Sequence, residues 1–239
     1  MKFEVAFTPA ELAGGDLGGR VVVVLDVLRA TSTIVEALAN GAQAVRPVSA
    51  VDEAVRAAEE IGRDRALLAG ERRSIRIEGF DLGNSPREFA RERVSGKVVV
   101  LTTTNGTVAI LASAAARRVL IGSFLNLDAV ARELVRDGGP VSIVCSGREG
   151  RFALEDALCA GALVRRASEL AGVALETNDA ARAALDLLAA HGADLAGAFA
   201  RTAAGRQLID AGLEADLECC ARVDAHAVVP ELRDRQITL

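Results

Sequence analysis

The stretch VVVVLDVLRATST, residues 21–33, joins an apolar run to side chains that could do chemistry. Asp26, Arg29, Thr31 and Ser32 come directly after the run. A carboxylate can hold a cation or attack phosphorus, while a guanidinium and hydroxyls can bind an anion. Placing a charge at the end of a core strand costs free energy, so we expect a chain to carry one there only where it serves a function. We therefore interpret Asp26 as a functional residue rather than a solubilising one.

The stretch TTTNGT, residues 102–107, is a second candidate for anion binding. Thr103, Thr104 and Asn105 offer side-chain donors, and Gly106 lets the backbone approach a ligand. The helix expected to follow adds the positive end of its dipole. An ordinary helix cap is the alternative, but it needs only one such residue.

The stretch GREGRF, residues 147–152, supplies Arg148 and Arg151. Arginine suits forked recognition of phosphate, carboxylate or sulfonate, although two solvated surface arginines are the alternative. Glu155 and Asp156 follow early in a predicted helix. The alternative is that they only stabilise this helix, because its dipole favours acids near the N-terminus. Adjacent carboxylates beside anion-binding groups favour a hard cation such as Mg²⁺, held by one or two acids and the substrate.

Cys145 and Arg151 also fit the pattern C-x5-R, which is typical of cysteine-dependent phosphatases. A thiolate there would be stabilised by the start of the next helix. A metal-independent cysteine phosphatase and a non-catalytic anion-binding protein are therefore the alternatives to a metal-dependent enzyme.

Short β-branched runs alternate with Ala-rich helical stretches and must position these loops. The alternation predicts a three-layer α/β/α fold with a mainly parallel sheet, in which ligands bind outside the carboxyl ends of the strands. We expect one α/β unit, 1–239. Similar strand–turn–helix segments in the two halves indicate the alternative of two interlocked, related subdomains, about 1–120 and 121–239. The tail at 219–232 reads as a strand at a sheet edge, because it contains Pro230.

The composition of the chain limits the kinds of partner that we expect the protein to bind. The net charge is -5 and aromatic residues make up 3% of the chain, which argues against nucleic acid. The N-terminus does not resemble a signal peptide, no apolar run reaches the length of a membrane span, and four cysteines suit a reducing compartment. We expect a cytoplasmic protein. The apolar stretch Ala180–Ala200 packs either within the chain or against a second subunit as a homodimer.

Four motifs, in order, resemble those of the 2-phosphosulfolactate phosphatase (ComB) family: DVLRATSTIVEALANGA, GERRSIRIEGFDLGNSP, TTTNGT and CSGREGRFALEDALCAGA. The resemblance covers Asp26 to about Ala162 and continues more loosely to VVPEL near the C-terminus. It implies an Mg²⁺-dependent hydrolysis of 2-phospho-3-sulfolactate to 3-sulfolactate and phosphate, a step of coenzyme M biosynthesis in methanogens. It leaves the substrate open in organisms without coenzyme M.

This resemblance and the residue types together assign the candidate site. The catalytic candidates are Asp26, Arg29 and Arg148, with Asp26 as metal ligand or nucleophile. The metal candidates are Asp26, Asp81, Glu155 and Asp156. The substrate-binding candidates are Thr31, Ser32, Arg72, Asn84, Ser85, Thr103, Thr104, Asn105, Gly106 and Arg151.

Overall fold

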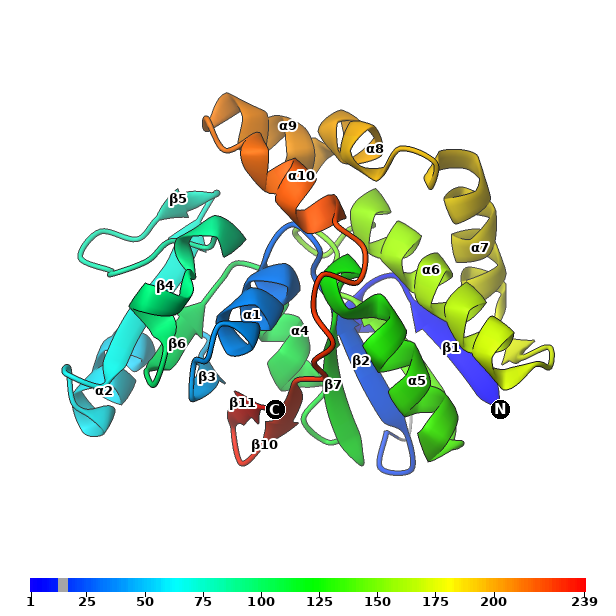
Figure 1. Ribbon diagram of the computed structural model, residues 1–239, viewed down its shortest axis with the longest axis horizontal. Helices are drawn as coiled ribbons and strands as arrows, with labels where there is room; N and C mark the ends of the chain where they lie inside the picture. The colour runs from blue at the N-terminus through cyan, green and yellow to red at the C-terminus, as the bar shows by residue number, and fades with distance from the viewer. Residues whose placement is uncertain (13–16) are drawn as a thin grey trace.

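The computed structural model describes residues 1–12 and 17–239. Its described residues form one large, mostly parallel sheet with helices around it (Figure 1), so the predicted α/β class with a mainly parallel sheet is confirmed. From one edge to the other the strands are β5 (Ile75–Arg76), β4 (Ala66–Arg72), β6 (Val98–Thr102), β3 (Ala44–Pro47), β11 (Gln236–Thr238), β10 (Glu231–Arg233), β7 (Arg118–Gly122), β2 (Val21–Leu25), β8 (Val141–Cys145), β1 (Lys2–Ala6) and β9 (Glu176–Thr177).

The helices connect these strands and close the fold at the C-terminal side of the sheet. They are α1 (Ala30–Ala39), α2 (Val51–Ile61), α3 (Arg91–Val94), α4 (Gly106–Ala112), α5 (Leu127–Asp137), α6 (Leu154–Ala171), α7 (Asp179–His191), α8 (Leu195–Arg201), α9 (Ala203–Asp210) and α10 (Ala215–Ala221). Short 3-10 helices span Pro9–Leu12, Pro86–Glu88 and Phe124–Asn126. Within the described residues, no helix is both long and apolar enough to cross a membrane.

Strand β2 shows why the core needs helices on both faces of the sheet. All five of its residues are buried. Val21, Val23 and Leu25 share a core cluster with residues of α5 and α6, whereas Val22 and Val24 share another with residues of α1 and α4. Successive side chains of a strand point to opposite faces, so an unbroken run of β-branched residues is what a doubly covered parallel strand requires.

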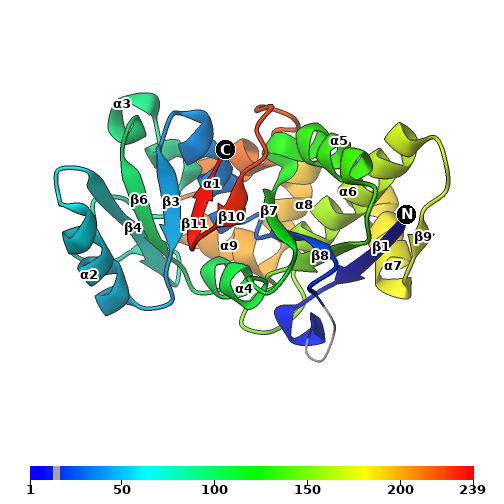
Figure 2. The same cartoon turned by 90° about the horizontal axis from the view of Figure 1, so that it is seen from below.

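The C-terminal tail corrects the prediction of an edge strand over 219–232, because residues 219–221 belong to α10 and only residues 231 and 232 of that stretch lie in a strand. Strands β10 and β11 form an antiparallel hairpin that lies inside the sheet, between β7 and β3 (Figure 2). Pro230 does not prevent this, because it precedes the first residue of β10 and only its carbonyl is used, as acceptor for the Ile121 N–H at 2.9 Å. Ile237 of β11 is fully buried.

The hairpin separates two sets of parallel strands, β4–β6–β3 on one side and β7–β2–β8–β1–β9 on the other. These sets do not follow the two halves of the chain, because β1 and β2 pair with β8. The division into two related subdomains near residue 120 stays a prediction. Helices α8, α9 and α10 lie together at one end of the sheet (Figure 1), and α9 contributes to the pocket described next.

Candidate active site

A pocket open to solvent lies at the carboxyl ends of β2, β4, β6 and β8. The start of α6 and one face of α9 complete its wall. This is the position that the parallel sheet predicts for a ligand. The residues that line it are Asp26, Leu28, Arg29, Glu71, Arg73, Ser74, Asn84, Thr103, Thr104, Asn105, Ser146, Gly147, Arg148, Glu149, Glu155, Asp156, Ala204, Gln207 and Leu208.

Asp26 follows β2 directly and is only 7% exposed. Its Oδ1 accepts a hydrogen bond from the Ala30 N–H at 3.0 Å, which fixes the carboxylate against the start of α1. Its Oδ2 faces Gly106, where an added Cβ would lie 2.6 Å from that oxygen. Burial raises the pKa of Asp26 to about 6, and the charge of Glu71 contributes in the same direction.

Glu155 and Asp156 lie in the first turn of α6 and are both buried. Asp156 accepts hydrogen bonds from the backbone N–H groups of Val27 at 2.8 Å and Gly147 at 3.1 Å. It therefore joins the loops after β2 and β8. Burial raises the pKa of both carboxyls, and the charge of Asp26 raises it further. The three acids therefore repel one another inside one pocket.

Glu71 is a fourth buried acid of the pocket, and the sequence reasoning missed it. It lies near the end of β4 and accepts from the N–H and the hydroxyl of Thr104, each at 2.9 Å. Its other oxygen accepts from the Ser74 N–H at 2.8 Å. The signal was available, because Glu71 follows an apolar strand in the same way as Asp26 does.

Two arginines of the pocket confirm the predicted convergence of the loops after β2 and β8. Arg29 is buried and forms an ion pair with the buried Asp216 of α10 at 2.7 Å. A second nitrogen of Arg29 donates to the Ser74 carbonyl at 3.2 Å. Arg148 is half-buried and donates to the side-chain oxygen of Gln207 on α9. Asp216 and Gln207 carried no motif, and only the folded chain brings them here.

The loop after β6 contains the stretch TTTNGT, for which the sequence left both anion binding and a helix cap open. The Thr103 hydroxyl accepts from the Thr107 N–H in the first turn of α4 at 3.1 Å and so stabilises the start of that helix, although Asn105 occupies the N-cap position. Asn105 accepts from the Glu149 N–H at 3.0 Å and so ties this loop to the loop after β8. Thr103, Thr104 and Asn105 all line the pocket, whereas Gly106 only supports Asp26 from behind.

Asn84 lies in the pocket with an unusual side chain. It is 4% exposed, and its Oδ1 is buried without a hydrogen-bond partner. A buried acceptor left unpaired costs free energy, and such atoms in folded proteins usually await a ligand, an ion or a water molecule. The neighbouring Ser85 does not line the pocket and donates to Asp216 at 2.6 Å instead.

Four other predicted binding residues also lie outside the pocket lining. Thr31 and Ser32 donate to the carbonyls of Asp26 and Val27, each at 2.9 Å, and so stabilise the turn into α1. Arg72 donates to Thr102 at 3.1 Å. Arg151 is exposed, and its backbone pairs with Arg148. Hydroxyls after a strand can thus serve local backbone groups as well as a ligand.

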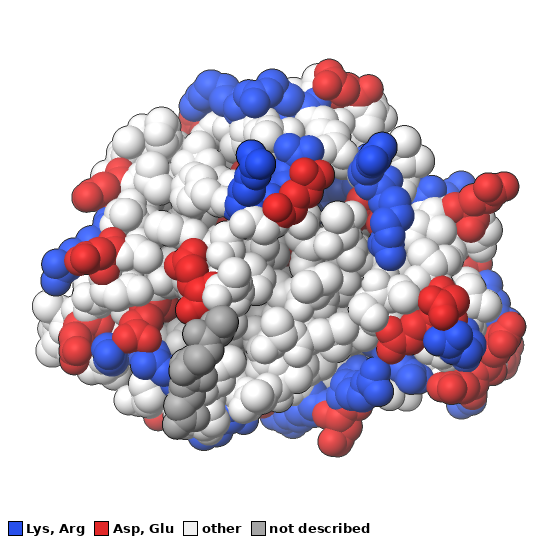
Figure 3. Space-filling view, turned by 180° about the vertical axis from the view of Figure 1, so that it is seen from behind, with Lys and Arg blue, Asp and Glu red and all other residues white. Residues whose placement is uncertain are grey.

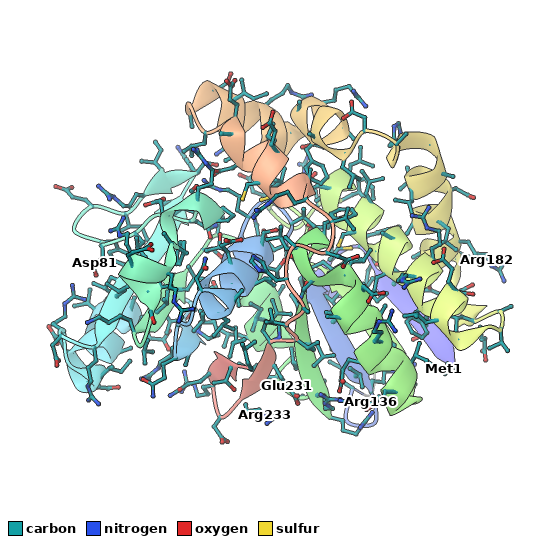
Figure 4. The ribbon with its side chains drawn as sticks, in the orientation of Figure 1. Met1, Asp81, Arg136, Arg182, Glu231 and Arg233 are labelled. Carbon is teal, nitrogen blue, oxygen red and sulfur yellow. The ribbon has the colours of Figure 1, made fainter. Side chains whose placement is uncertain are left out.

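Asp81 is the predicted metal ligand that the fold does not bring to the other acids. It accepts from the Leu68 N–H at 2.7 Å and forms an ion pair with Arg63 at 3.2 Å. Figure 4 shows Asp81 at the side of the molecule where β4 and α2 lie. It stabilises the outer part of the sheet rather than the pocket.

Cys145 lies in the hydrophobic core and not in the pocket lining. It is fully buried, and burial raises the pKa of its thiol, which is the opposite of what a nucleophilic thiolate requires. Arg151 does not face a ligand site either. The C-x5-R pattern is therefore not assembled as a phosphate-binding loop, and the geometry argues against the cysteine mechanism.

The side chains of the pocket are compatible with a metal site that uses only one or two carboxylates. Among the described residues there is no group of three or more His, Cys, Asp or Glu side chains that could hold a metal ion. Mg²⁺ commonly takes one or two carboxylates and completes its shell with water and substrate phosphate. Figure 3 shows acidic and basic side chains next to each other on the face opposite to that of Figure 1.

The fold and pocket define an α/β protein with a polar pocket at the carboxyl ends of parallel strands, where buried acids lie beside arginines. A scan against family models matches residues 6–235 to 2-phosphosulpholactate phosphatase. A protein of Caldanaerobacter subterraneus subsp. tengcongensis, named "Probable 2-phosphosulfolactate phosphatase", is 42% identical over 92% of this chain and 90% of its own. One of the same name from Symbiobacterium thermophilum is 41% identical over 98% and 99%.

The chain therefore belongs to the 2-phosphosulfolactate phosphatase family. This membership confirms the resemblance that the four motifs predicted, and with it the prediction of a phosphatase, which is a hydrolase.

Proposed function

We propose that this chain is an Mg²⁺-dependent phosphatase that hydrolyses 2-phospho-3-sulfolactate to 3-sulfolactate and phosphate in the pocket. The family model and the names of the relatives support this substrate. The observation that carries the proposal is the meeting of four buried or nearly buried acids with Arg29 and Arg148 in one pocket. A substrate with three anionic groups needs several cationic partners, and acids alone would repel it.

The residues of the pocket fit a magnesium ion. Asp26 and Glu155 would hold it, because both oxygens of Asp156 and of Glu71 already accept from backbone N–H groups, whereas the backbone hydrogen bond from Ala30 occupies only Oδ1 of Asp26. The unpaired Oδ1 of Asn84 is an additional oxygen ligand of the type that Mg²⁺ accepts. When bound, the ion would neutralise the crowded acids and draw negative charge from the phosphoryl oxygens.

The remaining groups of the chain orient the ester. Arg29 is fixed by Asp216 and presents its free N–H groups to the transferring phosphoryl group. Donors after β6 bind further phosphoryl oxygens. Water adds to phosphorus, the bond between phosphorus and the C2 oxygen breaks, and that oxygen takes up a proton to become the hydroxyl of 3-sulfolactate. Positioning and charge stabilisation account for most of the catalysis in such transfers.

The test is release of inorganic phosphate from 2-phospho-3-sulfolactate by the purified protein. We expect turnover with Mg²⁺ and its loss in EDTA, restored by excess Mg²⁺. Calorimetry with Mg²⁺ alone should give binding to the wild-type protein and none to Asp26→Asn. Turnover that survives EDTA would refute the metal dependence, and binding of the ester without any release of phosphate would favour a non-catalytic anion-binding protein.

Three further aspects stay predictions. They are the cytoplasmic location, the formation of a homodimer and a role in coenzyme M biosynthesis. Phosphate release from other phosphorylated hydroxy acids, compared under the same conditions, would show whether 2-phospho-3-sulfolactate is the preferred substrate.

A further inference from the structure

The side chain of Gln207 connects three parts of the pocket. Its Nε2 donates to the Ser74 hydroxyl at 3.1 Å, and its Oε1 accepts from Arg148. Ser74 in turn donates its N–H to Glu71 and accepts from Arg29 through its carbonyl. Gln207 is half-buried, lines the pocket and stands on α9, far along the chain from the loops that it joins.

Arg29 and Arg148, two of the three arginines that line the pocket, differ in how their charges are balanced. Arg29 is paired with Asp216, which is fully buried, so the pair is neutral as a whole. Arg148 forms no direct ion pair among the residues that the structure describes, although its charge lowers the pKa of the nearby Glu155, and its hydrogen-bonded side-chain partner, Gln207, is uncharged. An uncharged acceptor fixes a guanidinium in place without cancelling its positive charge.

We propose that Gln207 is a specificity residue, which positions Arg148 as the binding site for the second, non-reacting anion of the substrate. This inference rests on the proposed function, because it concerns how the same pocket tells a sulfonate-bearing ester from a simpler one. Arg29 then serves the transferring phosphoryl group, while Arg148 serves the sulfonate. The forked guanidinium can pair two sulfonate oxygens, and Gln207 holds the fork toward the pocket.

Two substitutions separate the position of Arg148 from its charge. Gln207→Met keeps nearly the same length and removes both hydrogen bonds. Gln207→Glu retains an acceptor for Arg148 but converts the contact into an ion pair and adds a negative charge to the lining. Arg206→Gln is the matched control, because Arg206 is exposed on the same helix and lies outside the pocket. It changes the net charge of α9 by the same amount as Gln207→Glu.

The measurement is kcat/KM for 2-phospho-3-sulfolactate beside 2-phospholactate, which lacks the sulfonate. For Gln207→Glu we expect a fall of about 10- to 100-fold on the first substrate, mostly in KM, the size expected when a charge-assisted hydrogen bond is lost. Gln207→Met should fall less, and 2-phospholactate should change by less than about 3-fold for either variant. The control should behave as wild type on both.

Binding of the product provides a readout that does not depend on turnover. We expect 3-sulfolactate to inhibit wild type more strongly than lactate does, and Gln207→Glu to remove that difference. Equal losses on both substrates would overturn the proposal and make Gln207 a residue that merely supports the pocket. Wild-type kinetics without any preference for the sulfonate-bearing ester would also overturn it. Wild type that fails to release phosphate at all would instead refute the proposed function.

Discussion

Replacing Asp26 by Asn should abolish turnover and at the same time stabilise the metal-free protein. Asn keeps the size of the side chain and the acceptor for the Ala30 N–H, but it removes a charge that is buried beside other acids. The pKa of Asp26 is raised from 3.8 to about 6, mainly because the carboxylate is buried. At about 1.4 kcal/mol per pKa unit, ionised Asp26 costs about 3 kcal/mol of folding free energy at pH 8.

The sign follows from proton binding. Between about pH 4 and pH 6 the folded protein holds a proton on Asp26 that the unfolded chain has lost, so stability falls as the pH rises through this window. The gain from Asp26→Asn should therefore be about 3 kcal/mol at pH 8 and less than about 1 kcal/mol at pH 4. For a chain of this size the former corresponds to a rise in Tm of roughly 6–12 °C.

The assay is thermal unfolding of wild type and Asp26→Asn in EDTA at both pH values, followed by a titration with Mg²⁺ at pH 8. Mg²⁺ should raise the Tm of wild type and leave that of the mutant unchanged, since binding to the folded state alone stabilises it. Asp210→Asn is the control, because Asp210 is exposed on α9 and loses the same charge. A gain that is absent at pH 8, or equal at the two pH values, would refute the reasoning.

Four further substitutions test the placement of individual residues. Cys145→Ser should keep most of its activity at a modest cost in stability, measured by turnover and thermal unfolding, because Cys145 lies in the core. Gly106→Ala should lower kcat at least about 10-fold in a folded protein, because its Cβ would push the Asp26 carboxylate aside. Asp81→Asn should leave the Mg²⁺ concentration for half-maximal activity unchanged, and a weaker Mg²⁺ response would return Asp81 to the site. Arg151→Lys should leave kcat/KM within about 2-fold on both esters, since Arg151 is exposed.

The sequence was sufficient to predict the elements that hold the pocket, because their signals are local. Short runs rich in β-branched residues predicted β2, β6 and β8, and polar residues after them predicted which loops converge. Asp26, Arg29, Arg148, Glu155 and Asp156 all line the pocket as the strand order requires. Their catalytic and metal roles remain predictions, since the geometry places the side chains without showing what they bind.

The residues that sequence reasoning missed are those whose role depends on long-range packing. Asp216 and Gln207 come from helices with no motif, and they meet the pocket only because α9 and α10 fold back over the strand ends. The prediction of Asp81 as a metal ligand was wrong for the opposite reason. The segment between β5 and α3 contains both Asn84, which lines the pocket, and Asp81, which supports β4. Spacing alone cannot separate two such residues without the path of the loop.

The prediction of an edge strand in the C-terminal tail was wrong for a related reason. A proline near a strand favours an edge, but the rule applies to the residue whose N–H is needed for pairing. Pro230 stands just before β10, so the hairpin can enter the sheet between β7 and β3. Only the pairing partners of β10 and β11 reveal this, and a single sequence does not contain them.

The buried acids connect the stability of the protein with its proposed chemistry. Asp26, Glu155 and Asp156 each have a raised pKa, because burial and mutual repulsion disfavour three negative charges in one pocket. Together these charges create a strong demand for positive charge in the pocket, where backbone N–H groups hold Asp26 and Asp156 in place. A cation bound at such a place gains the energy that the acids lost on folding, and this gain is what the comparison of Mg²⁺-dependent Tm values in wild type and Asp26→Asn measures.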